Sequence, residues 1–116
     1  MSIHYDNRTF RSISNSGTGE VGSETTFHYH QEGDVVWAEY SGGEIVRGTL
    51  LAKVQADGCL NMRYQHINRR GELMTGICYS TPELLPDGRM RLHEKWQWTS
   101  EEQSSGQSVI EEIPSE

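Results

Sequence analysis

Apolar and polar residues alternate along most of this chain, and glycine-centred turns interrupt the alternation at short intervals. A period of two is typical of β-strands that bury one face and leave the other in water. We therefore predict eight strands, over residues 7–14, 23–31, 34–41, 44–54, 59–68, 72–81, 89–99 and 107–113. The one stretch that fits a helical turn is 81–85, where Pro82 would take a first-turn position.

Tight turns between successive strands predict an antiparallel up-and-down meander. An open meander would leave two exposed edges, and closure removes both. We therefore predict an all-β fold in which the eight strands close into a barrel, with a two-sheet sandwich as the alternative. The length of 116 residues fits a single domain over 1–116, and we expect 1–6 and 114–116 to be loose termini.

The turn at residues 69–71 sets a register in which facing residues have numbers that sum to about 140. Cys78 then lies opposite Met62, whereas Cys59 points to the other face, so we expect two free thiols. Turns on either side extend the same parity to the neighbouring strands. The residues predicted to face inward are Val46, Gly48, Leu50, Ala52, Val54, Leu60, Met62, Tyr64, His66, Met74, Gly76, Cys78, Ser80, Met90, Leu92, Glu94, Trp96 and Trp98. The two inward glycines leave room for a bulky neighbour such as Trp98, or for a ligand.

Two parities are open for the second and third strands. The more apolar set, which we prefer, places inside Phe27, Tyr29, Val36, Ala38 and Tyr40. The opposite parity would place inside His28, His30, Val35, Trp37 and Glu39.

Charge and hydropathy exclude several classes of function. The net charge is −7 and the one pair of adjacent basic residues is Arg69-Arg70, which argues against a nucleic-acid partner. No apolar run approaches the roughly 18 residues of a membrane span, and the first residues lack the apolar core of a signal peptide. We therefore expect a cytoplasmic protein with no membrane partner.

Glu94 is the candidate for chemistry, because it shares its predicted inner face with Trp96 and Trp98. A lone buried carboxylate costs several kcal/mol unless it is paired, hydrogen-bonded or protonated. Candidates for its partner are His66, a tyrosine hydroxyl, Ser80, a water molecule or a ligand. The residues predicted to bind a ligand are Glu94, His66, Tyr64, Trp96, Trp98 and Tyr40.

His28 and His30 lie on one face of a strand at a spacing that can chelate a metal ion. A metal site usually needs a third ligand, and none stands at a telling distance in the sequence. We therefore expect an exposed histidine pair and no metal. The sequence also lacks the common nucleotide-binding, metalloprotease and serine-nucleophile motifs, so we assign no cofactor and no catalytic residue.

Five stretches give the chain a family resemblance: FHYHQEG (27–33), EYSGGEIVRGTL (39–50), DGCLNMRYQHIN (57–68), GELMTGIC (71–78) and LPDGRMRLHEKWQWT (85–99). With these it resembles small bacterial proteins of the calycin-like, avidin-like barrel type. The resemblance implies a barrel with a central pocket. Some members of that group are labelled N-acetylglutamate synthase, but acetyltransferases of that kind need a glycine-rich pyrophosphate-binding turn before a helix, which this sequence lacks. Its Tyr, Ser and Trp positions do not map one by one onto those of biotin-binding avidins.

Three hypotheses for function follow. The first is a barrel that binds a small, cationic or hydrogen-bonding molecule in its interior. The second is an isomerase-like enzyme that uses Glu94 or His66 as acid or base. The third is a filled barrel that acts through its outer surface as a homodimer, with an apolar patch made of Ile45, Leu51, Ile67, Leu73 and Ile77. A cavity of roughly 300 Å³ or more favours the first hypothesis, and a close-packed interior excludes the first two.

Overall fold

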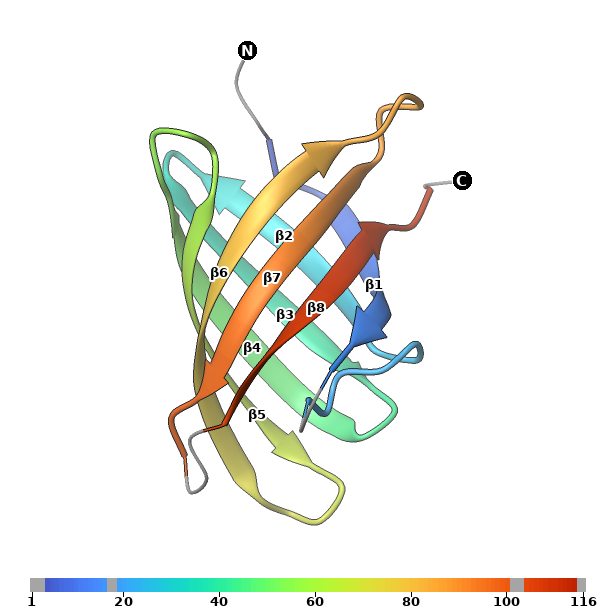
Figure 1. Cartoon of the computed structure of the whole chain (residues 1–116), viewed down its shortest axis with the longest axis vertical. Helices are drawn as coiled ribbons and strands as arrows, with labels where there is room; N and C mark the ends of the chain where they lie inside the picture. The colour runs from blue at the N-terminus through green and yellow to red at the C-terminus, as the bar shows by residue number, and fades with distance from the viewer. Residues whose placement is uncertain (1–3, 17–18, 101–103, 115–116) are drawn as a thin grey trace.

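Eight antiparallel strands close into a barrel in the computed structural model, which describes residues 4–16, 19–100 and 104–114 (Figure 1). The strands are β1 (Arg8–Asn15), β2 (Thr26–Glu32), β3 (Val35–Gly42), β4 (Ile45–Val54), β5 (Leu60–Asn68), β6 (Leu73–Leu84), β7 (Met90–Trp98) and β8 (Ser105–Glu112). All eight predicted strands and the predicted barrel are confirmed. Within the described residues, no helix is long and apolar enough to cross a membrane.

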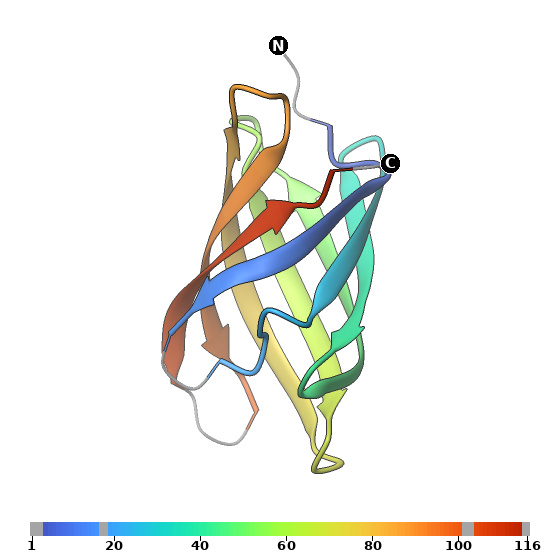
Figure 2. The same ribbon diagram turned by 90° about the vertical axis from the view of Figure 1, so that its right-hand side faces the viewer.

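Each strand pairs with the next along the chain, and β8 returns to pair with β1. Three hairpins, β2–β3, β4–β5 and β6–β7, therefore lie at one end of the barrel, which we call the upper end after its position in Figure 1. The connections β3–β4 and β5–β6 lie at the other, lower end, together with the end of β7 and the start of β8, as the side view in Figure 2 also shows. The candidate site described below lies toward the lower end.

The register predicted for β5 and β6 is confirmed. Met62 faces Cys78 and Leu60 faces Ser80, and the next pair of strands places Ser80 opposite Glu94. Gly71, in the β5–β6 turn, has a φ of +79°, a left-handed conformation that glycine adopts without steric cost. Both cysteines are buried free thiols.

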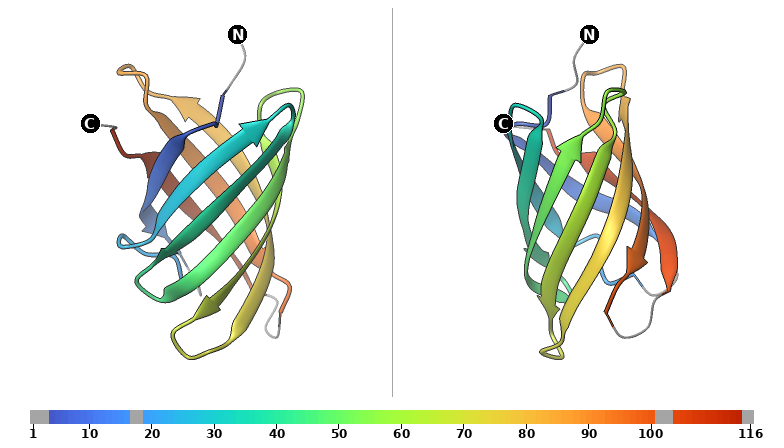
Figure 3. Two further views of the ribbon diagram at one scale, coloured as in Figure 1. Left: turned by 180° about the vertical axis from the view of Figure 1, so that it is seen from behind. Right: turned by 90° about the vertical axis from the view of Figure 1, so that its left-hand side faces the viewer.

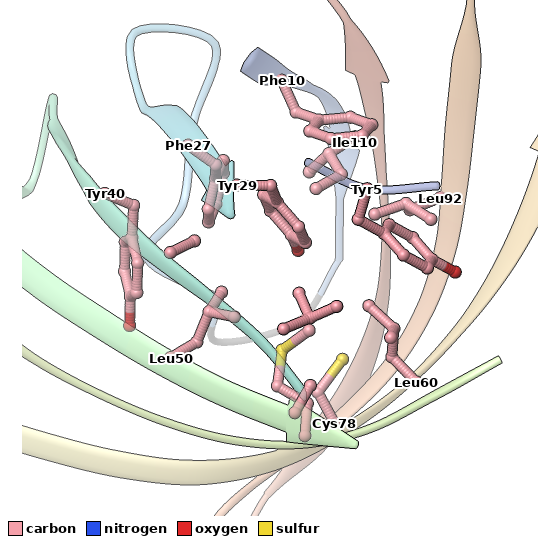
Figure 4. Close-up of a cluster of buried hydrophobic side chains, with 14 of the residues drawn as sticks. Tyr5, Phe10, Phe27, Tyr29, Tyr40, Leu50, Leu60, Cys78, Leu92 and Ile110 are labelled. Atoms are coloured by element: carbon pink, nitrogen blue, oxygen red, sulfur yellow. The ribbon is translucent and has the colours of Figure 1, made fainter. Parts of the chain in front are cut away.

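The preferred parity of β2 and β3 is also confirmed. Their buried residues are Phe27, Tyr29, Val36, Ala38 and Tyr40. The rings of Phe27 and Tyr40 stack with centroids 5.0 Å apart, and Figure 4 shows both in the barrel interior with Tyr29 between Phe27 and Tyr5. The opposite set, including His28 and His30, therefore lies on the outer face.

The inward–outward alternation of β4 is interrupted at the start of the strand. Ile45 faces Asn68 and Arg47 faces Ile67, so Val46 is the extra residue of a β-bulge. Ile45 is consequently 2% exposed and Val46 57% exposed. The prediction that Val46 faces inward and Ile45 outward is wrong, because a bulge shifts the two-residue alternation by one position.

The predicted helical turn over 81–85 is wrong as well. Strand β6 continues to Leu84 and pairs with β7 from Gly76 to Leu84, with Pro82 opposite Leu92. Beyond Ser80 the strand has no pairing with β5. A proline, which lacks an N–H group, is tolerated where one side of a strand is a free edge.

The N-terminal segment closes the upper end of the barrel. Tyr5 is 0% exposed, its backbone N–H donates to Gln31 Oε1 at 2.8 Å, and its hydroxyl donates to the carbonyl of Gly58. The expectation of a loose terminus over 1–6 is therefore wrong at Tyr5, while residues 1–3 lie outside the described part of the chain. In the segment 114–116, which was also expected to be loose, Pro114 is exposed. Residues 115–116 lie outside the described part of the chain.

Inward glycines make room for aromatic rings. A Cβ at Gly48 would meet the Tyr40 ring at 2.5 Å, and a Cβ at Gly76 would overlap the ring and hydroxyl of Tyr64. Trp98, the neighbour named from the sequence, pairs with Gly76 across the sheet, but it is Tyr64 that fills the space. The inward glycines thus fit the rings of the site into the barrel.

We expect Gly76→Ala to lower the free energy of unfolding by about 1–3 kcal/mol, because the added methyl group must push the Tyr64 ring out of its position. Gly22→Ala is the control, since a Cβ there meets nothing within 4 Å, and it should change stability by no more than about 0.5 kcal/mol. Urea unfolding of both variants measures the difference. Equal stability of the two variants would show that Tyr64 is not packed against Gly76.

Candidate functional site

The interior of the barrel contains a partly open cavity of about 50 Å³. All six residues predicted to bind a ligand line it, namely Tyr40 of β3, Tyr64 and His66 of β5, and Glu94, Trp96 and Trp98 of β7. The other residues around it come from β1, β2, β4, β5, β6, β8 and the β1–β2 connection, namely Asn15, Gly19, Glu20, Val21, Phe27, Leu50, Met62, Cys78 and Ser108. The sequence-predicted site residues are thus brought together at one place.

Two serines hold the Glu94 carboxylate. Ser80 Oγ donates to Glu94 Oε2 at 2.9 Å, and Ser108 Oγ donates to Glu94 Oε1 at 3.1 Å. Glu94 keeps some exposure as a residue, but its carboxyl group is enclosed by protein atoms. This burial raises the pKa of Glu94 to about 7, although the two serine hydrogen bonds favour the charged form and lower it.

These contacts answer which partner satisfies Glu94. Ser80 was among the candidates predicted from the sequence, Ser108 was not, and His66 bonds elsewhere. Both partners are neutral, so a negative charge on Glu94 has hydrogen bonds but no ion pair with any cation of the described residues. This is the arrangement in which a buried carboxyl group resists ionisation.

A second carboxylate, that of Glu20, lies at the lower end of the cavity. It comes from the β1–β2 connection and accepts from three donors of the β5–β6 hairpin: His66 Nε2 at 2.8 Å, Asn68 Nδ2 at 2.9 Å and Arg70 at 2.9 Å. We call His66, Asn68 and Arg70 the three-donor cradle. Because the cradle is built on one hairpin and Glu20 on another segment, the Glu20 side chain can leave it without breaking a strand.

His66 contacts both Glu20 and the aromatic residue Tyr40. It is 2% exposed, and its Nδ1 lies 3.0 Å from the Tyr40 hydroxyl. Desolvation lowers the pKa of His66, and the Glu20 carboxylate partly opposes this. A neutral ring satisfies both neighbours if Nε2–H donates to Glu20 and Tyr40 donates its hydroxyl proton to Nδ1.

We expect Glu20→Ala to lower the free energy of unfolding by about 1–3 kcal/mol, because the buried Nε2–H of His66 loses its acceptor. Glu24→Ala provides the matched control, since Glu24 lies in the same connection and is exposed. Urea unfolding should separate the two variants. If both have wild-type stability, water replaces Glu20 at no cost and the side chain does not seal the cavity.

Tryptophan and tyrosine rings form the wall between the two carboxylates. The centroids of Trp96 and Trp98 lie 5.7 Å apart, and those of Tyr64 and Trp98 lie 5.8 Å apart. Trp96 Nε1–H donates to Asn15 Oδ1 at 3.0 Å, and Asn15 Nδ2 donates to the Val21 carbonyl. Asn15 therefore ties the wall to the segment that carries Glu20.

One hydroxyl inside the barrel lacks a partner. Tyr29 is 0% exposed, and its oxygen is the one buried side-chain polar atom without a hydrogen bond in the part of the chain that the structure describes. Figure 4 shows this oxygen directed toward the middle of the barrel. Buried hydroxyls are normally hydrogen-bonded, so Tyr29 is an exception, and it is not among the residues that line the cavity.

Sequence reasoning missed four polar residues of the site: Asn15, Glu20, Asn68 and Ser108. Extending the inward alternation of β5 by one step would have placed Asn68 inside. Alternation around Ile110 would have done the same for Ser108. No periodic signal exists for Glu20, because it lies outside the strands.

An eight-stranded up-and-down barrel with a small aromatic and polar cavity belongs to the class of closed barrels whose interior is just wide enough for side chains or one small ligand. A comparison with protein families agrees: the family described as avidin-like protein matches residues 3–113. The chain therefore belongs to the avidin-like protein family. No curated protein and no solved structure gives a significant match.

Proposed function

We propose that this protein binds a small molecule inside the barrel, with an N–H donor group of the ligand against Glu94. The observation that carries the proposal is a carboxyl group enclosed beside aromatic rings and held by two neutral hydroxyls. An ammonium, amide or urea group would supply the donor or positive charge that the ionised carboxylate lacks. The faces of Trp96 and Trp98 would favour a cationic group at the same place.

Cavity size limits the ligand. The volume of about 50 Å³ is enough for a few water molecules, and it is well below the roughly 300 Å³ typical of ligand pockets. The ligand is therefore either a few heavy atoms in size or displaces Glu20. We favour displacement, because Glu20 fills the three-donor cradle with a carboxylate that a ligand carboxylate could replace.

The class of ligand that follows is a small compound with N–H donors at one end and a carboxylate at the other. A panel of small amines, amides and ureas, each with and without a terminal carboxylate, tests it by thermal shift followed by isothermal titration. We expect at least one compound to bind with 1:1 stoichiometry. Its carboxylate-free analogue should bind on the order of tenfold more weakly, which corresponds to about 1.4 kcal/mol.

Glu94→Gln and Glu20→Gln separate the two ends of the proposed site. Glu94→Gln should abolish binding of an ammonium compound, because the amide offers it no charge. Glu20→Gln should strengthen binding of a carboxylate compound, because the competing charge is removed from the cradle. Binding that is indifferent to both substitutions would place the ligand elsewhere and contradict the proposal.

An acid/base enzyme is the second candidate, and the pKa of about 7 at Glu94 is the observation that favours it. A catalytic acid or base works best when its pKa lies near the operating pH. Conversion of a bound panel compound, followed by NMR and lost in Glu94→Gln, would support this candidate. Binding without conversion supports a binding protein.

A homodimer is proposed for the outer surface. Residues from β4 to β6 form an exposed apolar patch, with Leu51, Ile67, Leu73 and Ile77 between 36% and 64% exposed. Ile45 does not belong to it, because the bulge turns that side chain inward, and Val46 takes its place. Sedimentation velocity tests the proposal, with Leu73→Glu expected to convert a dimer to a monomer and a wild-type monomer contradicting it.

A further inference from the structure

Two imidazoles and a carboxylate meet on the outer face of β2 and β3. The cavity lies on the inner face of these strands. Figure 3 shows this side of the barrel toward the viewer in its left-hand view. The metal-ligating atoms of His28, His30 and Glu39 all lie within 4.8 Å of one another. It is the one group of three such side chains within the described ranges 4–16, 19–100 and 104–114.

Strand register creates this group. His28 and Glu39 are direct partners across the β2–β3 ladder, and His30 lies two residues along from His28 on the same face. The rings of His28 and His30 have centroids 4.6 Å apart, and His30 Nε2 lies 2.9 Å from Glu39 Oε1. The third ligand that the sequence did not reveal is thus supplied by the adjacent strand.

We propose that His28, His30 and Glu39 bind a divalent transition-metal ion, with Zn²⁺ as the probe. Two imidazoles and one carboxylate are a ligand set that Zn²⁺ accepts, with water or an external donor in the fourth position. Ligand atoms at about 2.0–2.1 Å from a tetrahedral zinc lie about 3.4 Å from each other. Atoms within 4.8 Å of one another reach that arrangement by small side-chain rotations.

The surroundings hold the site in place. The Trp37 ring stacks on His30 with centroids 5.5 Å apart and an interplanar angle of 26°, which restricts the imidazole to one side. Strand partners on the two flanks are uncharged, with Thr9 opposite His28 and Thr49 opposite Glu39. Both ladder strands are paired along the whole segment, so two of the ligands are fixed to one rigid element.

A second surface pair is a matched control for the alternative that His30 and Glu39 only form a hydrogen bond with each other and bind no metal. His93 Nε2 lies 2.8 Å from Glu83 Oε1 on the outer face of β6 and β7, at nearly the same distance as the His30–Glu39 pair. That pair has no third histidine, cysteine or carboxylate within reach in the described residues. If an exposed imidazole–carboxylate pair were enough, both places would bind zinc alike.

Isothermal titration of Zn²⁺ into tag-free protein stripped with a chelator measures the site. We expect one equivalent to bind, with His28→Ala and Glu39→Gln each weakening the affinity at least about tenfold and His93→Ala leaving it unchanged. All three positions are exposed or partly exposed on the barrel surface, so the variants should fold. Circular dichroism and urea unfolding of each variant check that it folds.

Nitrogen-15 NMR of the imidazoles locates the ion. Zinc should shift the ring resonances of His28 and His30 together and leave those of His66 and His93 in place. Absence of binding below millimolar zinc in the wild type would overturn the proposal. So would equal affinity in wild type and His28→Ala.

Discussion

Raising the pH from about 4.5 to above 7 is expected to lower the free energy of unfolding by about 3 kcal/mol through Glu94 alone. In the folded protein burial raises the pKa of this carboxyl group to about 7, whereas its ordinary value is 4.5. Below the ordinary value the group is protonated in both states, and pH has no effect through it. Between the two values the unfolded chain releases the proton and the folded chain retains it, so rising pH favours unfolding. Above the folded pKa both states are ionised and the loss is complete.

Glu94→Gln removes this pH dependence and keeps the shape; the amide oxygen accepts from one serine and the amide NH2 donates to the other, whose hydroxyl turns from donor to acceptor. We expect the variant to match the wild type near pH 4 and to exceed its stability by up to about 3 kcal/mol at pH 8. Urea unfolding at a series of pH values measures both, and the difference between the curves isolates Glu94 from His66 and the other titrating groups. Glu32→Gln is the control, the same substitution at an exposed position of β2. A Glu94→Gln variant that is several kcal/mol less stable at pH 8 would mean that a charged partner holds the carboxylate.

Truncation of Tyr5 is expected to cost about 3–5 kcal/mol, the range for removing a large buried aromatic side chain. Tyr5 is 0% exposed and its ring lies near that of Tyr29 at 6.2 Å between centroids, so alanine leaves a cavity at the upper end of the barrel. Figure 4 shows its ring reaching in beside Leu60 and Leu92. Tyr5→Phe keeps the ring and loses the bond to the Gly58 carbonyl, so it should cost about 1 kcal/mol.

Tyr79→Ala is the control, because it truncates the same residue type at a position that is 44% exposed. It should cost at most about 1 kcal/mol, the range of a single cross-strand contact. Guanidinium unfolding of the three variants gives the values. A Tyr5→Ala variant as stable as Tyr79→Ala would show that the N-terminal segment does not close the barrel in solution.

Local periodicity was sufficient for most of the architecture. The two-residue alternation in β5, β6 and β7, combined with turns of fixed length, predicted which residues share the inner face, including Glu94, His66 and Trp98. These strands are joined by tight hairpins, so the register of one fixes that of the next. The fold could be predicted for the same reason, because alternating strands with tight turns leave few ways to bury the apolar face.

The misses share a different cause, which is that they depend on contacts or irregularities that alternation does not encode. A bulge at Val46 changes parity without any glycine or proline to mark it. Tyr5 and Glu20 lie outside the strands and reach their partners across 53 and 46 residues of sequence, respectively. Glu39 joins the histidine pair only through the register of β3 against β2.

Native mass spectrometry of freshly purified wild-type protein, beside Glu94→Gln prepared in the same way, tests most directly whether the barrel binds a small molecule at Glu94. We expect the wild type to carry an additional mass at 1:1 stoichiometry that is released on denaturation, and the variant to lack it. Compounds from the panel, added to protein that has been denatured and refolded, should restore a bound mass to the wild type alone. A wild-type protein that stays at the mass of the bare chain with every compound, or a bound mass of equal abundance in Glu94→Gln, would contradict the proposed function.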